Sequence, residues 1–322
     1  MATGKRSETV CVLGGTGFVG RSVCAQLIAA GFAVRVPTRN RQRNRNLLVL
    51  PGVDLRPADI HDPETLESLF EGVSTVINLV GILNERGHDG SGFRHAHVEL
   101  AEKIVVACQE VQVGRLIQMS ALKANAERGP SHYLRTKGQA EQVIKDQCGE
   151  QIDYTIFRPS VIFGPDDSFI NRFAGILKFS PILPLAQLDA RFAPVYVEDV
   201  AAAFVRAVLD SRTQGKTYEL CGPDVYTLGE ILRFIRRELG IRRAIVGLPM
   251  PLGRFQAWVA DYLIPGKPFS LDNMRSLTVA SVCNEDGFAD LGIRPRRMQT
   301  IVRQYLGSNP DLLSELRHST GR

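Results

Sequence analysis

Two residues four positions apart, Tyr133 and Lys137, are the first candidates for catalysis in this sequence. On a helix they share one face, so the lysine ammonium would lie beside the phenol. A neighbouring cation stabilises the phenolate and would lower the pKa of Tyr133 from about 10, as suits a proton donor to a carbonyl oxygen. Ser120 lies thirteen residues before Tyr133 and would donate to the same oxygen. A Tyr-x-x-x-Lys pair by itself is more often a surface pair, so the surrounding elements decide its meaning.

The clearest signal around this pair is a set of three glycines at intervals of three, Gly14, Gly17 and Gly20. They follow a short apolar run that predicts a buried strand over 9–13, and they open a helical stripe that stops at Gly31. The first glycine permits a tight turn, the second lets backbone N–H groups approach a diphosphate, and the third lets the helix pack closely on the strand. The helix N-terminus adds free donors and partial positive charge. The segment predicts the phosphate-binding turn of a dinucleotide site.

Further apolar runs predict strands at 33–36, 52–60, 73–81, 115–121 and 153–165, with helices between several of them, including 93–112 and 133–144. Strands that alternate with helices predict an α/β fold with a doubly wound parallel sheet, whose ligands bind at the carboxyl ends of the strands. We expect the turn, these strand ends and the lysine to contact a nicotinamide cofactor. The expected contact residues are Gly14, Thr16, Gly17, Phe18, Val19, Gly20, Thr38, Arg39, Asp59, Ile60, Asn78, Val80, Gly81, Lys137, Pro159, Ser160, Val161 and Ile162.

The residues after the second strand indicate which dinucleotide binds. Many NAD-binding units place an acidic residue there for the ribose 2′-hydroxyl, whereas this sequence has Thr38 and Arg39. A guanidinium forms paired, charge-assisted bonds with a 2′-phosphate that a carboxylate would repel. We therefore expect NADP(H), with NAD(H) as the alternative. Asp59, after the third strand, either faces the adenine end of the dinucleotide or caps the next helix, and both interpretations stay open.

The composition is that of an ordinary soluble globular protein. Of the 322 residues, 44% are hydrophobic and the net charge is +5. No apolar run approaches the ~20 residues that span a bilayer. The first residues lack the apolar core of a secretion signal, so we expect a cytoplasmic protein, either free or peripheral to the membrane. The mild positive charge suits an anionic cofactor or an acidic lipid surface, and we expect no nucleic-acid partner.

The six cysteines and six histidines show no pattern of pairing or metal ligation. The cysteines lie far apart without a C-x-x-C pair, and several fall in apolar patterns, so we expect small core residues and neither a disulfide nor a zinc site. The histidines lack the spacing of ligands on a helix, so we expect no metal. The cysteines are Cys11, Cys24, Cys108, Cys148, Cys221 and Cys283.

The second half of the sequence is less regular. We expect a dinucleotide-binding core over 8–165, a mixed region over 166–307 with a substrate lobe and returning strand elements at about 190–222, and a polar tail over 308–322. An apolar stripe through Phe169 and Phe173 would form a wall of the substrate pocket. The segment 248–264 concentrates aromatic and aliphatic residues. It is interpreted as a lid over the pocket, as core packing, or as a contact with a lipid surface or partner.

Four segments together resemble the extended and atypical branches of the short-chain dehydrogenase/reductase superfamily. They are Gly14–Gly20, Tyr133–Lys137, Arg158–Gly164 and Pro194–Val200, and the resemblance covers roughly residues 8–235. The Tyr-Leu-Arg-x-Lys segment followed by the run 163–173 is similar to the subgroup named for the NADPH-binding accessory subunit of respiratory complex I and its bacterial relatives.

The resemblance implies a Rossmann sheet of about seven parallel strands, a smaller C-terminal substrate lobe, and Ser120, Tyr133 and Lys137 as the catalytic trio. It also places His97 on the cofactor side of the site, where the family often has an asparagine that holds a water for proton relay, a role that histidine can take. The mitochondrial member of the subgroup keeps Tyr-x-x-x-Lys and serves as a structural subunit with bound nucleotide.

Three hypotheses about function follow. The leading one is an NAD(P)-dependent oxidoreductase that acts on an apolar carbonyl or a quinone-like small molecule. The second is a non-catalytic NADPH-binding subunit or assembly factor of a respiratory or membrane-associated complex, with 248–264 as the contact. The third is an NAD-dependent epimerase/dehydratase, against which the region after Gly164 is rich in Phe, Leu and Ile and shows no obvious polar clamp for a diphosphate.

Overall fold

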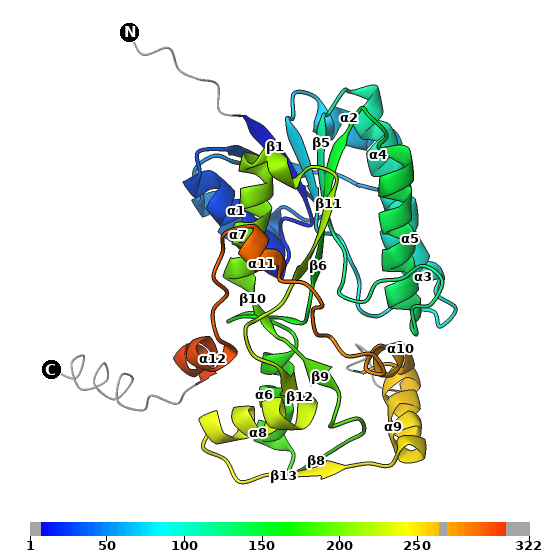
Figure 1. Ribbon diagram of the computed structural model, residues 1–322, viewed down its shortest axis with the longest axis vertical. Helices are drawn as coiled ribbons and strands as arrows, with labels where there is room; N and C mark the ends of the chain where they lie inside the picture. Colours follow the sequence, from blue (N-terminus) through cyan, green and yellow to red (C-terminus); the bar gives the residue numbers. More distant parts are fainter. Residues whose placement is uncertain (1–7, 264–268, 307–322) are drawn as a thin grey trace, which may run out of the picture.

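Seven parallel strands form the central sheet in a computed structural model that describes residues 8–263 and 269–306 (Figure 1). Their order across the sheet is β11, β6, β5, β4, β1, β2, β3. The strands are β1 Thr9–Leu13, β2 Ala33–Thr38, β3 Val53–Pro57, β4 Thr75–Asn78, β5 Arg115–Met119, β6 Asp153–Pro159 and β11 Lys216–Leu220. The chain winds outward from β1 in both directions, so the strand order reverses between β1 and β4. The predicted fold class, with about seven strands, is confirmed.

Helices cover both faces of this sheet (Figure 1). One face carries α1 (Phe18–Ala29) and α7 (Val197–Leu209), and the other carries α2 (Pro63–Phe70), α4 (Leu100–Glu110) and α5 (His132–Gln147). In β1, Val10 and Val12 join the first core, whereas Cys11 and Leu13 join the second. Successive side chains of a strand point to opposite faces, so a strand buried on both sides is apolar throughout.

The helix predicted over 93–112 consists of three consecutive pieces. They are α3 (Ser91–Arg94), a π-helical turn η2 (His95–Glu99), and α4. The predicted helix from Tyr133 is α5, and its N-cap is the buried Ser131, whose Oγ accepts a hydrogen bond from the Leu134 N–H at 3.1 Å. This cap fixes where the helix that carries Tyr133 begins. Two short 3₁₀ helices are η1 (Gln42–Val49) and η3 (Ser211–Thr213).

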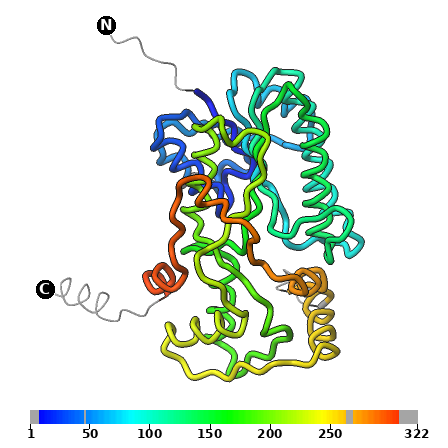
Figure 2. The backbone as a smooth tube through the Cα atoms, viewed as in Figure 1, coloured from blue at the N-terminus to red at the C-terminus, as the bar shows by residue number. Residues whose placement is uncertain are grey.

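A second group of elements lies beyond the carboxyl edge of the sheet, with its own core around Phe163, Leu177 and Ile231 (Figure 1). Phe169 and Phe173 pack against that core. Figure 2 shows that the chain enters this lobe after β6, returns through α7 and β11, and then enters it again. The elements are β7 Ile162–Phe163, α6 Ile170–Phe179, β8 Ile182–Leu185, β9 Arg191–Phe192, β10 Val195–Tyr196, β12 Tyr226–Thr227, α8 Leu228–Glu238, β13 Ala244–Gly247, α9 Met250–Leu263, α10 Leu271–Ser276 and α12 Met298–Leu306. α11 (Gly287–Asp290) instead packs on β11, and its Phe288 joins the first core of the sheet. The predicted tail, 308–322, lies outside the described residues.

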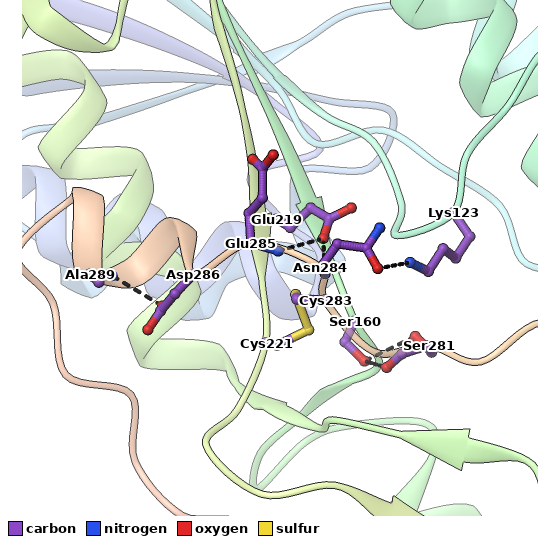
Figure 3. Close-up of a disulfide and its surroundings, with 10 residues drawn as sticks. All are labelled: Lys123, Ser160, Glu219, Cys221, Ser281, Cys283, Asn284, Glu285, Asp286 and Ala289. Carbon is purple, nitrogen blue, oxygen red and sulfur yellow. Dashed lines mark hydrogen bonds between the residues drawn. A yellow bond between two sulfur atoms is a disulfide. The ribbon is translucent and has the colours of Figure 1, made fainter.

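The prediction that no cysteine forms a disulfide is wrong, because Cys221 and Cys283 are bonded (Figure 3). The other four cysteines are free and buried, as expected of core residues. Cys221 directly follows β11, and Cys283 lies in a segment tied to the same edge, where the Asn284 N–H donates to Glu219 Oε2 at 2.6 Å. The two residues are 62 positions apart. A spacing of that length carries no local signal, so only the tertiary fold brings the two cysteines together.

We expect four free thiols per chain when the protein is denatured without reductant, because the other two are in the disulfide. We also expect dithiothreitol to lower the free energy of unfolding by about 2–4 kcal/mol, since the bond closes a long loop in the unfolded chain. Thiol titration and urea unfolding measure the two quantities, and in the C221S/C283S double variant the reductant should have no effect. Six titratable thiols would contradict the bond. Disulfides are rare in the cytosol, so the same titration bears on the expected location.

Candidate functional site

The glycine turn between β1 and α1 has the geometry that the sequence predicted. The Gly17 N–H donates to the Gly14 carbonyl at 2.9 Å, and Gly14 has a φ of +78°, which favours glycine. A Cβ at Gly20 would lie 2.3 Å from the Gly14 carbonyl oxygen, so only glycine lets α1 pack this closely on the turn. Gly17 is the N-cap of α1 and supplies no side-chain hydrogen bond, which leaves backbone donors at the helix start for an anion.

Lys137 joins three elements at the carboxyl edge of the sheet. Its ammonium donates to the carbonyl of Val80, after β4, and to the carbonyl of Met119, the last residue of β5, both at 3.2 Å. The side chain is only 2% exposed, and burial lowers the pKa of Lys137 to about 8 although Glu141, one turn further along α5, favours the charged form. A Cβ at Gly81 would lie 3.0 Å from this ammonium, so Gly81 leaves room for it.

Ser120 follows Met119 directly and is 3% exposed, and its Oγ forms no hydrogen bond within the described part of the chain. Its backbone N–H is held by the Phe157 carbonyl at 2.7 Å, so the residue is fixed at the end of β5. A buried hydroxyl without a partner is costly and rare in a folded protein. This hydroxyl is therefore available for a ligand oxygen.

The prediction that Lys137 lowers the pKa of Tyr133 is not supported. Burial instead raises the pKa of Tyr133 to about 12. The ring packs edge-on against His97 and Phe93, at 5.6 and 6.2 Å between ring centroids, and Lys137 directs its protons to backbone carbonyls. Tyr133 is consequently a neutral phenol at physiological pH, which is the form that donates a proton to a carbonyl oxygen.

His97 is held by both of its ring nitrogens. Nε2 accepts a hydrogen bond from the Ile82 N–H at 3.2 Å, and Nδ1 lies 2.9 Å from Thr136 Oγ1. Since that hydroxyl donates to the His132 carbonyl, Nδ1 carries the ring proton. Burial, and then the charge of Lys137, lower the pKa of His97 to about 2. The neutral ring ties the π-helical turn to α5, and this geometry leaves neither nitrogen for the proton relay that the resemblance implied.

Several of the other predicted contact residues already have protein partners. Asn78 bonds the side chain of Gln118 at 2.8 Å and the Val80 N–H at 3.1 Å, so it shapes the loop after β4. Thr38 Oγ1 accepts from the Asn40 N–H and from Asn44 Nδ2. Arg39 beside it is exposed and has no hydrogen bond in the described chain. Contact of these residues with a cofactor stays a prediction.

The alternative that Asp59 caps the following helix is wrong. Asp62 caps α2, accepting from the Thr65 N–H at 3.1 Å, while Asp59 accepts from the His61 N–H within the turn at 3.0 Å. Ile60 packs against the core beneath α2 and α4. Asp59 therefore lies at the carboxyl end of β3 without a helix to cap, and its contact with an adenine ring stays a prediction.

Of the predicted nicotinamide-facing residues after β6, Ser160 lies beside Ser281 (Figure 3). Ser160 Oγ lies 2.8 Å from the Ser281 carbonyl oxygen and 2.9 Å from Ser281 Oγ. Pro159 ends β6, Val161 packs on the lobe core, and Ile162 begins β7. The disulfide holds the same segment against β11.

Sequence reasoning missed Asp272, which holds the start of α5 from the lobe. Its carboxylate accepts from the N–H groups of His132 and Tyr133, at 2.7 and 3.1 Å, across 140 and 139 positions of sequence. Ser276 Oγ also donates to Ser131 Oγ at 2.8 Å. An acidic residue at a helix N-terminus is stabilising. One helix distant in sequence, α10, thus fixes the backbone of Tyr133, and no local pattern indicates this contact.

These features, a glycine turn on a doubly wound sheet with a serine at a strand end and a Tyr-x-x-x-Lys helix, are those of the extended short-chain dehydrogenase/reductases. Residues 10–221 match the NAD dependent epimerase/dehydratase family. The chain belongs to that family, and its cofactor is therefore a nicotinamide nucleotide.

Two curated relatives and one solved structure illustrate the range of similar proteins. The chain is 32% identical to the mitochondrial NADH dehydrogenase [ubiquinone] 1 alpha subcomplex subunit 9 of Arabidopsis thaliana, over 94% of this chain and 79% of that protein. It is 28% identical to a ceramide reductase of Caulobacter vibrioides, over 78% and 76%. A UDP-glucose 4-epimerase from Thermotoga maritima has the same fold, with a TM-score of 0.74, 16% identity and coverage of 96% and 99%.

We expect the free energy of unfolding to rise with pH between about 8 and 10.5 through Lys137, whose pKa is lowered from 10.5 to about 8 on folding. In this window the unfolded chain binds a proton that the folded chain has lost, so the contribution is up to about 1.4 kcal/mol per pH unit. Urea unfolding as a function of pH measures the slope. Lys137→Met should lack this slope and the exposed Lys145→Met on the same helix should keep it. Equal slopes in wild type and Lys137→Met would contradict the burial of the charge.

Proposed function

We propose that this chain is an NADP(H)-dependent reductase of an apolar carbonyl or quinone-like substrate. The observation that carries the proposal is the unpaired, buried hydroxyl of Ser120, fixed beside the carbonyl to which Lys137 donates. The Ser120 hydroxyl therefore lies at the ligand-binding edge of the sheet without a hydrogen-bond partner among the described residues. One of the similar proteins bears the name ceramide reductase, which describes reduction of a lipid.

The residues present fit a bound dinucleotide. A side chain at Gly20 would collide with the turn, and the first turn of α1 offers uncapped N–H groups to a diphosphate. Gly81 leaves space at the Lys137 ammonium, where ribose hydroxyls would bind. When bound, the reduced nicotinamide supplies hydride.

The chain's own residues would supply positioning and the proton. The Ser120 hydroxyl would orient the substrate oxygen, and the phenol of Tyr133 would donate its proton to that oxygen as negative charge develops. Burial keeps the phenol of Tyr133 protonated, so the rate of proton donation to the substrate would not fall until well above neutral pH. Lys137 would hold the ribose hydroxyls of the cofactor, and Asp272 would keep the backbone of Tyr133 in place.

A second candidate is a subunit that binds NADPH without turning it over, in contact with a respiratory complex. Two observations favour it. The chain is similar to a protein named as a subunit of NADH dehydrogenase. His97 has no free ring nitrogen, so the relay that would return a proton to Tyr133 is missing from this position.

Replacement of Tyr133 by Phe should slow hydride transfer by about 10²–10⁴-fold, because it removes the proton donor and leaves the fold intact. Single-turnover absorbance of NADPH, with a short-chain quinone and a long-chain methyl ketone as probes, measures the rate. Tyr154→Phe on β6 is the matched control and should leave the rate unchanged. A wild-type chain that holds NADPH but transfers no hydride to these probes would contradict the reductase and favour the second candidate.

Arg39→Gln should weaken NADPH binding by roughly 10–100-fold, the usual value of a charge-assisted hydrogen bond, and leave NADH binding nearly unchanged. Arg43→Gln, an exposed arginine of the same loop, serves as control and should alter neither. Calorimetric titration gives the dissociation constants. Equal losses for both nucleotides would exclude Arg39 as the ligand of the 2′-phosphate.

A further inference from the structure

Helix α9 buries its small residues and exposes its large apolar ones, which is the reverse of an ordinary surface helix. Its small residues Gly253, Ala257 and Ala260 are buried, and a Cβ at Gly253 would lie 2.3 Å from the Ala186 side chain. Its large apolar side chains face solvent, with Phe255 63% and Trp258 44% exposed. Four of them, Leu252, Phe255, Trp258 and Tyr262, form one stripe, which we call the α9 ridge. Figure 1 places α9 at the outer edge of the lobe.

The aromatic rings of the ridge stack on one another. Ring centroids lie 6.1 Å apart for Phe255 and Trp258, 5.5 Å for Trp258 and Tyr262, and 4.1 Å for Tyr262 and His88. His88 Nδ1 lies 3.5 Å from the buried carboxylate of Asp261. Since His88 belongs to the loop after β4, the ridge is anchored to the site's own loop and is a preformed surface. A row of exposed aromatic side chains on a rigid helix indicates an interaction surface.

Among the described residues, exposed positive charges outnumber negative ones near the ridge, where the carboxylates include the buried Asp261 and the exposed Asp89 next to His88. Residues 239–260 include Arg242, Arg243 and Arg254 and contain no Asp or Glu. Arg242 and Arg254 are exposed and form no ion pair with a described carboxylate. Arg243 bonds the carbonyls of Leu177 and Lys178, which places the exposed Lys178 and the 90% exposed Phe179 beside this segment. The surface is thus apolar and cationic.

We propose that the α9 ridge docks on a bilayer surface that contains anionic phospholipids. Tryptophan and tyrosine favour the headgroup level, where the ring is buried and its polar atom stays hydrated, and arginines attract anionic lipids. α9 has 14 residues, and no helix in the described ranges is long and apolar enough to cross a membrane, so the helix would lie in the interface plane. A second copy of the chain is disfavoured because it would bring like charges together. The proposal does not depend on catalysis at Ser120 and Tyr133.

Trp258 is the chain's only tryptophan, so its fluorescence reports directly on the ridge. We expect a blue shift of the emission, and flotation of the full chain, with vesicles of phosphatidylcholine and phosphatidylglycerol but weakly with phosphatidylcholine alone. Phe255→Ser should weaken this binding by about tenfold, since one aromatic side chain no longer leaves water. Leu209→Ser, at an exposed leucine of α7, is the matched control and should bind like wild type. Arg242→Gln with Arg254→Gln should remove the preference for the anionic vesicle, as should high salt.

Absence of both the spectral shift and flotation would overturn the proposal, as would equal binding to the two vesicle types. A concentration-dependent dimer that produces the same shift without lipid would assign the ridge to a second copy. Binding to protein-containing membranes but not to bare vesicles would assign it to a protein partner. Either assignment would also overturn docking on lipid.

Discussion

The buried ammonium of Lys137 is the interaction on which the site depends. A charge in this position is costly to desolvate, and it is tolerated because the carbonyls of Val80 and Met119 accept its protons and Glu141 lies one turn away. The two carbonyls belong to the loop after β4 and to the end of β5. The Lys137 side chain therefore holds α5 against the loop after β4 and the end of β5. Ser120, which follows Met119, lies at the same edge, where ligands bind.

The site is built from both parts of the molecule. The sheet supplies the glycine turn and the end of β5, whereas the lobe supplies Asp272, which holds the backbone of Tyr133. The segment around Ser281, fastened by the disulfide to the end of β11, closes over Ser160 (Figure 3). α9 packs beside α10, which carries Asp272, and stacks on His88 of the loop after β4. The α9 ridge, which we propose docks on lipid, is thereby joined through packed side chains to the elements of the candidate site.

The sequence predicts what depends on local pattern. Apolar runs identified the strands, and the spacing of Gly14, Gly17 and Gly20 identified the turn, because each depends on neighbours within one or two elements. What it misses arises from distant contacts. Asp272 and the Cys221–Cys283 bond join segments 140 and 62 positions apart. The direction of the Tyr133 pKa shift depends on burial, and the engagement of His97 depends on a π-helical turn that periodicity cannot distinguish from an α-helix.

The central claim is that the carboxyl edge of this sheet holds a nicotinamide dinucleotide with its phosphates on the glycine turn. Mass spectrometry of the small molecules released when freshly purified protein is denatured tests it most directly, after incubation with an equimolar mixture of NADPH and NADH and removal of the unbound fraction. The account predicts close to one dinucleotide per chain, enriched in the phosphorylated form. Release of neither dinucleotide would contradict it.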